Sequence, residues 1–129
     1  MEAKIIKKYS KFSIAQLKKK ATTKFNSFIR KRDEAQRCIS CDSPYFTDAG
    51  HFYSGGKYPD LKFNENNVHG QCKTCNYNLD ANINEYRLRL ENKIGSEKLE
   101  ELDFLAKRSK QTGYKWDRIF LIEIIEKYK

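Results

Sequence analysis

The chain has 129 residues, of which 26 are Lys or Arg and 17 are Asp or Glu, so its formal net charge is +9. This length fits one domain. Apolar residues make up only 39% of the chain, and it contains no apolar run long enough for a transmembrane helix. The positive charge favours an anionic partner such as nucleic acid or a membrane surface.

The excess positive charge lies at one end of the chain. Residues 1–37 hold 12 Lys or Arg and 3 Asp or Glu, a net charge of +9, whereas residues 38–129 hold 14 of each kind. We expect residues 1–12 to form a loose basic arm. Ser13 is predicted to cap a helix that runs to about Glu34, with Gln16 completing a capping box.

The predicted first helix is amphipathic, with an apolar face for the core and a basic face for an anion. Its basic face is expected to neutralise DNA phosphates without reading sequence. A solvated face of a core helix and a helix lying on a membrane surface have the same pattern. The expected DNA-binding residues before the first cysteine are Lys18, Lys19, Lys20, Lys24, Arg30, Arg32 and Arg37.

The rest of the chain predicts an α+β fold. Short strands are expected at 48–53 and 66–71, followed by a helix from Lys73 to a stop at Gly95. Ser96 is expected to cap a helix at 97–109, with a break at 111–113 and a last helix at 116–128. The last helix is apolar enough to complete the core or to form a dimer interface.

Four cysteines form two CxxC pairs, Cys38 with Cys41 and Cys72 with Cys75, separated by 30 residues. Two such turns supply four thiolates for one tetrahedral zinc, a closed site that stabilises a fold and leaves no open position for chemistry. The N-terminus lacks the apolar stretch of a signal peptide, so we expect a cytoplasmic protein whose cysteines ligate metal. One structural Zn²⁺ per chain is therefore predicted, in a treble-clef arrangement.

Both histidines lie between the cysteine pairs, and two asparagines flank the second pair. His51 comes first, Asn67 lies five residues before Cys72, and Asn76 directly follows Cys75. This order resembles the HNH, or ββα-metal, nuclease motif, in the version of the phage junction-resolving endonuclease VII. The resemblance implies that His51 is the general base, that Asn67 holds the loop around it, and that Asn76 binds a catalytic Mg²⁺ or Mn²⁺.

One position departs from the usual motif. Many HNH enzymes carry an Asp directly before the base, where this chain has Gly50. Asp48 and His69 are the expected further ligands of the catalytic ion, although Asp48 should point to the opposite strand face from His51 unless the strand bulges. Asn76 could instead cap a helix, and His69 could instead form hydrogen bonds in the core.

A longer string resembles the phage lambda NinG family, also called Rap, over about residues 15–95. It comprises Arg30-x-Arg32-Asp33, residues 48–52, residues 63–69, and Cys75-Asn76 followed by Asn82 and Tyr86-Arg87. The resemblance implies a structure-specific endonuclease of phage recombination that cuts branched DNA such as Holliday junctions and D-loops in the bacterial host cell. Symmetric cutting of a junction needs two active sites, so we expect a homodimer.

These inferences divide the chain into three segments of a single compact domain. Residues 1–37 are the basic arm and DNA-binding helix, 38–95 the zinc-stapled HNH-like nuclease core, and 96–129 a C-terminal helical segment. Lys57 and Lys62, beside Gly55-Gly56, are expected to meet the DNA backbone. The alternative from another class is a non-catalytic zinc module that binds DNA or RNA, which the glycine at position 50 favours.

Overall fold

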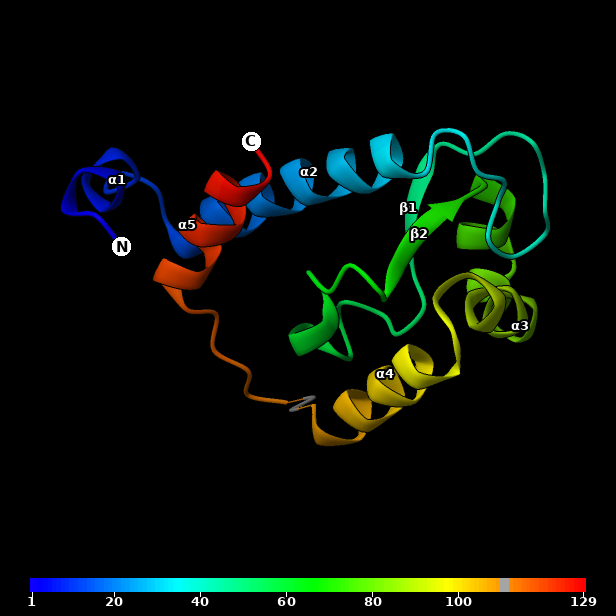
Figure 1. Cartoon of the computed structure of the whole chain (residues 1–129). Coiled ribbons are helices and arrows are strands. Elements are labelled where there is room, and N and C mark those ends of the chain that lie inside the picture. The colour runs from blue at the N-terminus through cyan, green and yellow to red at the C-terminus, as the bar shows by residue number, and fades with distance from the viewer. Residues whose placement is uncertain (110–111) are drawn as a thin grey trace. The chain divides into compact units, whose positions relative to one another are not determined.

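The computed structural model describes residues 1–109 and 112–129, and these residues form two compact units (Figure 1). One unit joins Met1–Phe28 to Lys115–Lys129, and the other is formed by Ile29–Tyr114. Helices and a small sheet are both present, which confirms the expected α+β class. The segments expected at 1–37, 38–95 and 96–129 stay predictions. They divide the chain by expected function, whereas the two units divide it by compactness.

The first unit is helical. It contains α1 (Ala3–Lys8), the greater part of α2 (Ile14–Arg32) and α5 (Arg118–Lys127). The predicted capping box is confirmed, because the Ser13 N–H donates to Gln16 Oε1 at 2.8 Å and the Gln16 N–H donates to Ser13 Oγ at 3.1 Å.

The expectation of a loose arm at residues 1–12 is wrong. Residues 3–8 are helical, and the following Tyr9 is buried, with its main-chain oxygen accepting a hydrogen bond from Arg118 Nη2 at 2.6 Å. An arginine more than 100 residues away therefore anchors this segment, which no local pattern could indicate.

In the same unit, α5 lies beside the N-terminal part of α2 (Figure 1). The rings of Phe25 and Tyr128 pack edge to face with centroids 5.1 Å apart. Four apolar side chains of α5 are buried, whereas Phe120 is 38% exposed, and the homodimer stays a prediction without an assigned interface. The buried residues are Leu17, Ala21, Phe25, Leu121, Ile122, Ile124 and Ile125.

In the second unit, β1 (Asp48–His51) and β2 (Val68–Gln71) form an antiparallel pair in which Gly50 lies opposite His69. Both strands lie within the predicted ranges but are shorter. Beyond β1, the backbone leaves the ladder because the Tyr53 N–H bonds to the Asn67 side chain rather than to a strand.

The helix expected to start at Lys73 is interrupted, which corrects the sequence-based boundary. A π-helical turn covers Thr74–Asn78 and a 3-10 turn covers Asp80–Asn82. Ala81 and Asn82 have positive φ angles of 69° and 46°, a region that α-helical residues cannot adopt, so α3 starts only at Ile83.

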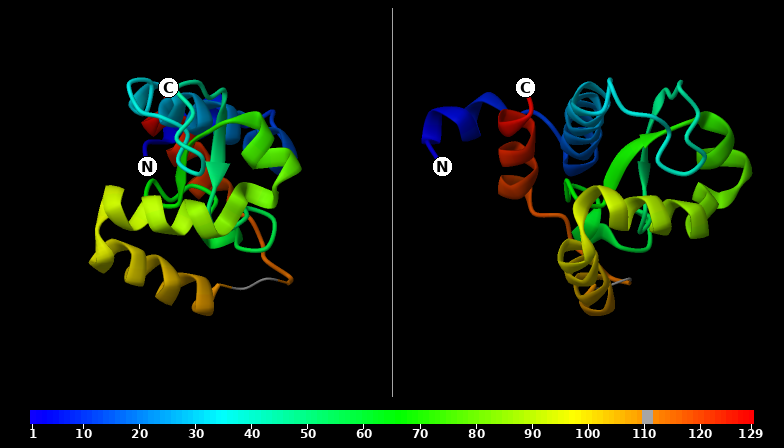
Figure 2. Two further views of the ribbon diagram at one scale, coloured as in Figure 1. Left: turned by 90° about the vertical axis from the view of Figure 1, so that its right-hand side faces the viewer. Right: turned by 45° about the vertical axis from the view of Figure 1, so that its right-hand side comes forward.

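Two successive helices, α3 (Ile83–Ile94) and α4 (Ser96–Arg108), contact each other and cover the core of this unit (Figure 2). They join at Gly95, whose φ of 90° suits a glycine. Gly95, and not Ser96 as expected, is the N-cap of α4, and Ser96 Oγ donates to Glu91 instead. The core comprises Ile39, Phe52, Leu61, Tyr86, Leu90, Leu99, Leu102 and Ala106.

The last expected elements follow α4. The predicted helix at 116–128 is observed as α5, which begins two residues later because the Asp117 carboxylate accepts a hydrogen bond from the Phe120 N–H and caps it. The break expected at 111–113 begins at a residue outside the described ranges.

Candidate functional site

The four cysteines form one cluster at the base of the hairpin. Their Sγ atoms lie within 4.8 Å of one another, and the Sγ atoms of Cys41 and Cys72 are 3.7 Å apart. Main-chain N–H groups point at the sulfurs: Cys72 N donates to Cys38 Sγ at 3.3 Å and Cys75 N to Cys72 Sγ at 3.5 Å. Although burial opposes ionisation of Cys38, such amide contacts hold the pKa of its thiol below the ordinary value.

This geometry fits a metal such as zinc. A tetrahedron with zinc–sulfur bonds of about 2.3 Å places its sulfurs about 3.8 Å apart, close to the shortest separation observed. The two CxxC turns, one before the hairpin and one directly after β2, converge as their spacing predicts. The four cysteines could therefore hold one metal ion in a closed, four-sulfur site.

His51 ends β1, and its imidazole is held in one orientation. Nε2 lies 2.9 Å from the Lys62 main-chain oxygen. A carbonyl oxygen only accepts, so Nε2 carries the proton and Nδ1 keeps a free lone pair. Burial lowers the pKa of His51 to about 4, despite the favourable carbonyl contact, so the ring is neutral at pH 7. A neutral imidazole with a free Nδ1 can accept a proton.

Asn67 is fully buried and ties together the loop that follows His51. Its Oδ1 accepts from the Tyr53 N–H at 2.8 Å, and its Nδ2 donates to the oxygens of Tyr53 at 2.9 Å and Leu61 at 3.0 Å. The Asn67 main-chain oxygen also accepts from the Phe52 N–H at 2.9 Å. The amide thus joins both ends of the segment 53–61, which lies between His51 and Lys62 in the chain.

Asp48 and Asn76 meet at the start of β1. Asn76 Nδ2 donates to Asp48 Oδ2 at 3.0 Å, Thr47 Oγ1 donates to Oδ1 at 2.9 Å, and Lys73 Nζ is 3.6 Å from Oδ1. Partial burial opposes ionisation, but these contacts hold the pKa of Asp48 below its usual value. Carboxylate and amide oxygens are hard ligands of the kind that Mg²⁺ or Mn²⁺ prefers.

The strand geometry also relates Asp48 to position 50. Side chains two residues apart share a strand face, so Asp48 lies on the face to which the usual Asp before the base would point. Asp48 is displaced from that position by two residues along β1.

The space beside Gly50 is filled by the side chain of Gln71. No pattern in the sequence indicated a role for this glutamine. A Cβ atom at position 50 would lie 1.9 Å from Gln71 Oε1. The Gln71 side chain is fully buried, and its Nε2 donates to Ser40 Oγ at 2.8 Å and to the Ala81 oxygen at 2.7 Å. Gln71 thus fills the space beside Gly50.

His69 and Arg32 are placed differently from expectation. His69 Nε2 donates to the Asn66 oxygen at 2.8 Å, and Arg32 Nη2 donates to His69 Nδ1 at 3.1 Å, so both ring nitrogens are occupied. Burial lowers the pKa of His69 to about 3, assisted by the charges of Lys93 and Arg32. This neutral ring has no lone pair left for an ion. The contacts of His69 therefore favour the alternative prediction, in which it forms hydrogen bonds in the core.

Arg32 is likewise used inside the protein, which argues against its expected DNA contact. Its guanidinium donates to both Asp33 oxygens at 2.8 and 2.9 Å and to the Val68 oxygen at 2.8 Å. Asp33 is buried and also accepts from the Gly70 N–H at 2.8 Å and from Lys93 at 3.0 Å. Burial raises its pKa, but these cations and hydrogen bonds outweigh it and hold the pKa far below the usual value. The network fixes the end of α2 to β2.

The other expected DNA-binding residues lie at varied positions. Arg37 donates to the Asp42 oxygen at 2.9 Å, and Lys18 Nζ lies 5.0 Å from the Trp116 ring centroid. Lys62 is partly buried, with its Nζ 5.8 Å from the Phe63 ring centroid. The remaining members of the set are exposed: Lys19, Lys20, Lys24, Arg30 and Lys57.

Among the described residues, no helix is both long enough and apolar enough to cross a membrane. No solved structure matches the chain significantly.

Comparison with known proteins places the chain in a family. The family model described as bacteriophage lambda NinG protein matches residues 2–129. The ninG proteins of Escherichia phage lambda, Escherichia phage 933W and Salmonella phage P22 are each 38% identical over 96 residues, covering 73% of this chain. Those matches cover 47–48% of the relatives, so the chain spans about half the length of the curated proteins it matches. The chain therefore belongs to the bacteriophage lambda NinG family, as its sequence string indicated.

Proposed function

We propose that the protein is a metal-dependent endonuclease that hydrolyses phosphodiester bonds of branched DNA during phage recombination. The observation that supports it most is the state of His51: a neutral imidazole whose Nε2 proton is held by a carbonyl and whose Nδ1 is free to act as a base. Asn67 holds the loop beside this ring at the motif position that implies such a role.

His51 would act as general base. Nδ1 takes a proton from a water molecule, the water oxygen forms a bond to phosphorus, and the bond from phosphorus to the leaving oxygen breaks. The hydrogen bond from Nε2 to Lys62 stabilises the imidazolium that forms, because the carbonyl dipole then faces a cation. Asn67 keeps the loop, and with it that carbonyl, in place.

Asp48 and Asn76 are the residues that would hold a Mg²⁺ or Mn²⁺ ion. Such an ion polarises the scissile phosphate and stabilises the leaving oxygen. Two protein ligands are few, but Mg²⁺ commonly keeps several waters and binds through one or two carboxylates together with substrate phosphates. The contact between Asp48 and Asn76 supports this assignment because it brings the two oxygen-bearing side chains together.

The cysteine cluster would bind zinc for stability only. A closed site of four sulfurs offers no coordination position to substrate. Its role would be to fasten the turn at Cys38–Cys41 to the end of β2, and so to fix the hairpin that carries His51 and Asp48.

Cleavage assays would decide between the enzyme and a non-catalytic zinc module. Wild type, His51→Ala, Asp48→Asn and Asn76→Ala would be incubated with labelled four-way junction, D-loop and linear duplex DNA in Mg²⁺ or Mn²⁺. We expect wild type to cut the branched substrates, and each variant to lose about 10²-fold or more of the rate. Zinc content and circular dichroism would check that each variant is folded.

The outcomes separate the assignments. If wild type binds junctions but cuts none of them with either ion, the chain is a binding module, which Gly50 in place of the usual Asp favours. If wild type cuts and His51→Ala cuts equally well, the base is another residue. If Asp48→Asn and Asn76→Ala leave the dependence on Mg²⁺ unchanged, the ion is held elsewhere.

A further inference from the structure

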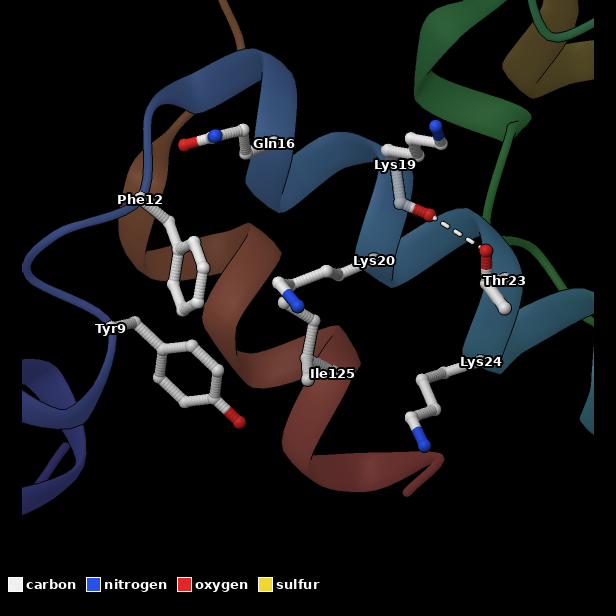
Figure 3. Close-up of a pocket in the computed structure, with 8 residues that line it drawn as sticks. All are labelled: Tyr9, Phe12, Gln16, Lys19, Lys20, Thr23, Lys24 and Ile125. Carbon is white, nitrogen blue, oxygen red and sulfur yellow. Dashed lines mark hydrogen bonds between the residues drawn. The ribbon is translucent and has the colours of Figure 1, made fainter.

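A pocket of about 560 Å³ opens in the first unit, and the residues that line it include none of those assigned above to chemistry (Figure 3). It lies between α2, the segment that follows α1, and α5. Its apolar wall is formed by Tyr9, Phe12 and Ile125, and its basic rim by Lys19, Lys20 and Lys24. The volume falls within the range of about 300–1,000 Å³ that is typical of sites for molecules the size of a nucleotide.

The aromatic wall is firmly anchored. The Tyr9 hydroxyl donates to the Glu126 carboxylate, and burial together with this contact raises its pKa to about 12, so the phenol is neutral at pH 7. The main-chain oxygen of Tyr9 accepts a hydrogen bond from Arg118 Nη2 at 2.6 Å. The Phe12 ring lies 6.3 Å from that of Tyr9, centroid to centroid. Two rings fixed at this separation present a preformed apolar surface.

The Phe12 ring is partly exposed and is contacted by two lysines of the chain. Lys20 Nζ lies 4.5 Å and Lys11 Nζ 5.5 Å from its centroid, and both lysines are exposed. Phe12 itself is only partly buried. A ring that exposed side chains can reach is also within reach of a flat, electron-poor group from a ligand.

The rim carries positive charge without compensation. Lys20 and Lys24 are four residues apart, so their ammonium groups lie on one side of α2, whereas the Lys19 side chain points to the other side (Figure 3). None of the described residues lining the pocket is acidic. The nearby Glu126 is already engaged by Tyr9 and by Lys129 at 3.0 Å.

We propose that this pocket binds an unpaired nucleotide of single-stranded DNA, with the base against Phe12 and Ile125 and the flanking phosphates on the lysine rim. An aromatic platform beside a row of cations is the chemistry by which proteins hold single strands without reading sequence. Bases of an intact duplex are stacked and cannot enter, so the site selects unpaired DNA. The choice of DNA rests on the proposed function, whereas binding itself requires no cleavage.

Binding assays with matched oligonucleotides isolate the base contact. Fluorescence anisotropy would compare a ten-residue oligothymidylate with an abasic strand of the same length and charge, using the full chain carrying His51→Ala in Mg²⁺-free buffer. We expect the oligothymidylate to bind about 5- to 150-fold more tightly, which is the range for stacking one base on an aromatic side chain. Phe12→Ala should remove most of this preference and change abasic binding less than about twofold.

Control variants separate the base contact from charge and folding. Phe104→Ala removes an exposed phenylalanine of α4 that also lies beneath a cation, Arg108, and should change neither affinity. Phe12→Trp should restore the preference, while Phe12→Leu should keep the fold but not the preference. Lys24→Gln should weaken both strands alike and lower the salt dependence of binding.

The proposal is overturned if the chain carrying only His51→Ala binds the two strands equally, or if adding Phe12→Ala and adding Phe104→Ala to that chain have equal effects. Oligouridylate bound more than about tenfold more tightly than oligothymidylate would assign the pocket to RNA instead. Phe12-dependent binding to vesicles of phosphatidylcholine and phosphatidylserine, without base preference, would assign it to a membrane. Since the chain carries His51→Ala throughout, a failure of the nuclease proposal leaves these results interpretable, and the reverse also holds.

Discussion

Replacing Asn67 by alanine tests whether one buried amide holds the loop beside His51. Three hydrogen bonds are lost, to Tyr53 N, Tyr53 O and Leu61 O, at 2.8 to 3.0 Å. A fully buried group left without a partner costs about 1–3 kcal/mol, and each partly buried bond contributes about 0.5–1.5 kcal/mol. We therefore expect Asn67→Ala to lower the free energy of unfolding by about 2–6 kcal/mol.

The measurement is urea unfolding of the zinc-loaded protein, followed by far-ultraviolet circular dichroism. The adjacent Asn66→Ala is the matched control, because the Asn66 side chain has no hydrogen bond in the described part of the chain, and its cost should be below about 1 kcal/mol. Asn67→Asp keeps the shape but turns an anionic oxygen toward two carbonyls, so it should destabilise at least as much as alanine. A loss below about 1 kcal/mol for Asn67→Ala, or equal losses at positions 66 and 67, would refute the bracing role.

Three further predictions concern the metal, the histidines and the strand. Metal analysis should find about one zinc per wild-type chain, and Cys41→Ser should lose the zinc. Wild type should unfold when a chelator removes the metal. Wild type that stays folded without zinc would contradict the proposed site. Because burial lowers the pKa of His51 to about 4 and of His69 to about 3, from the ordinary 6.5, the unfolded chain binds more protons below pH 6.5. Stability is thus complete above that pH and should fall by about 2–3 kcal/mol per histidine by pH 4.5 in urea titrations, whereas a flat profile would show that the rings are not buried neutral. Gly50→Ala should cost about 1–3 kcal/mol because its Cβ would meet Gln71 Oε1, and adding Gln71→Ala should recover part of that loss; an additive double mutant would mean that the two side chains do not collide.

Local chemistry explains what the sequence could predict. The CxxC pairs identify the cluster because the two-residue spacing is itself the chelating geometry. The Ser13–Gln16 capping box marks the start of α2 because its partners lie within four residues. The sequence motifs also predicted where the two strands lie. They did not predict where the strands end, because those ends depend on hydrogen bonds to Asn67.

Long-range contacts explain what the sequence could not predict. Arg32 sits in a run of basic residues and looks like the others, but its guanidinium meets the main chain of β2 at Val68 and the ring of His69. No sequence pattern indicated the role of Gln71, because that role depends on the space that Gly50 leaves beside it in the folded structure. The interruption before α3 depends on the left-handed conformation of Ala81. Alanine rarely adopts this conformation, so the sequence does not predict it there.

The net charge of +9 therefore has a narrower meaning in the structure than in the sequence. One of the cations of residues 1–37, Arg32, neutralises Asp33 inside the second unit, and Lys18 lies over Trp116. The exposed lysines Lys19, Lys20 and Lys24 of α2 belong to the first unit, whereas the exposed Arg30 and Lys31 of the same helix belong to the second unit, as do His51 and the cysteine cluster. The DNA contacts predicted for Lys19, Lys20 and Lys24 and the chemistry proposed for His51 thus involve different compact units. The net charge indicates an anionic partner, but it does not indicate the chemistry proposed for His51.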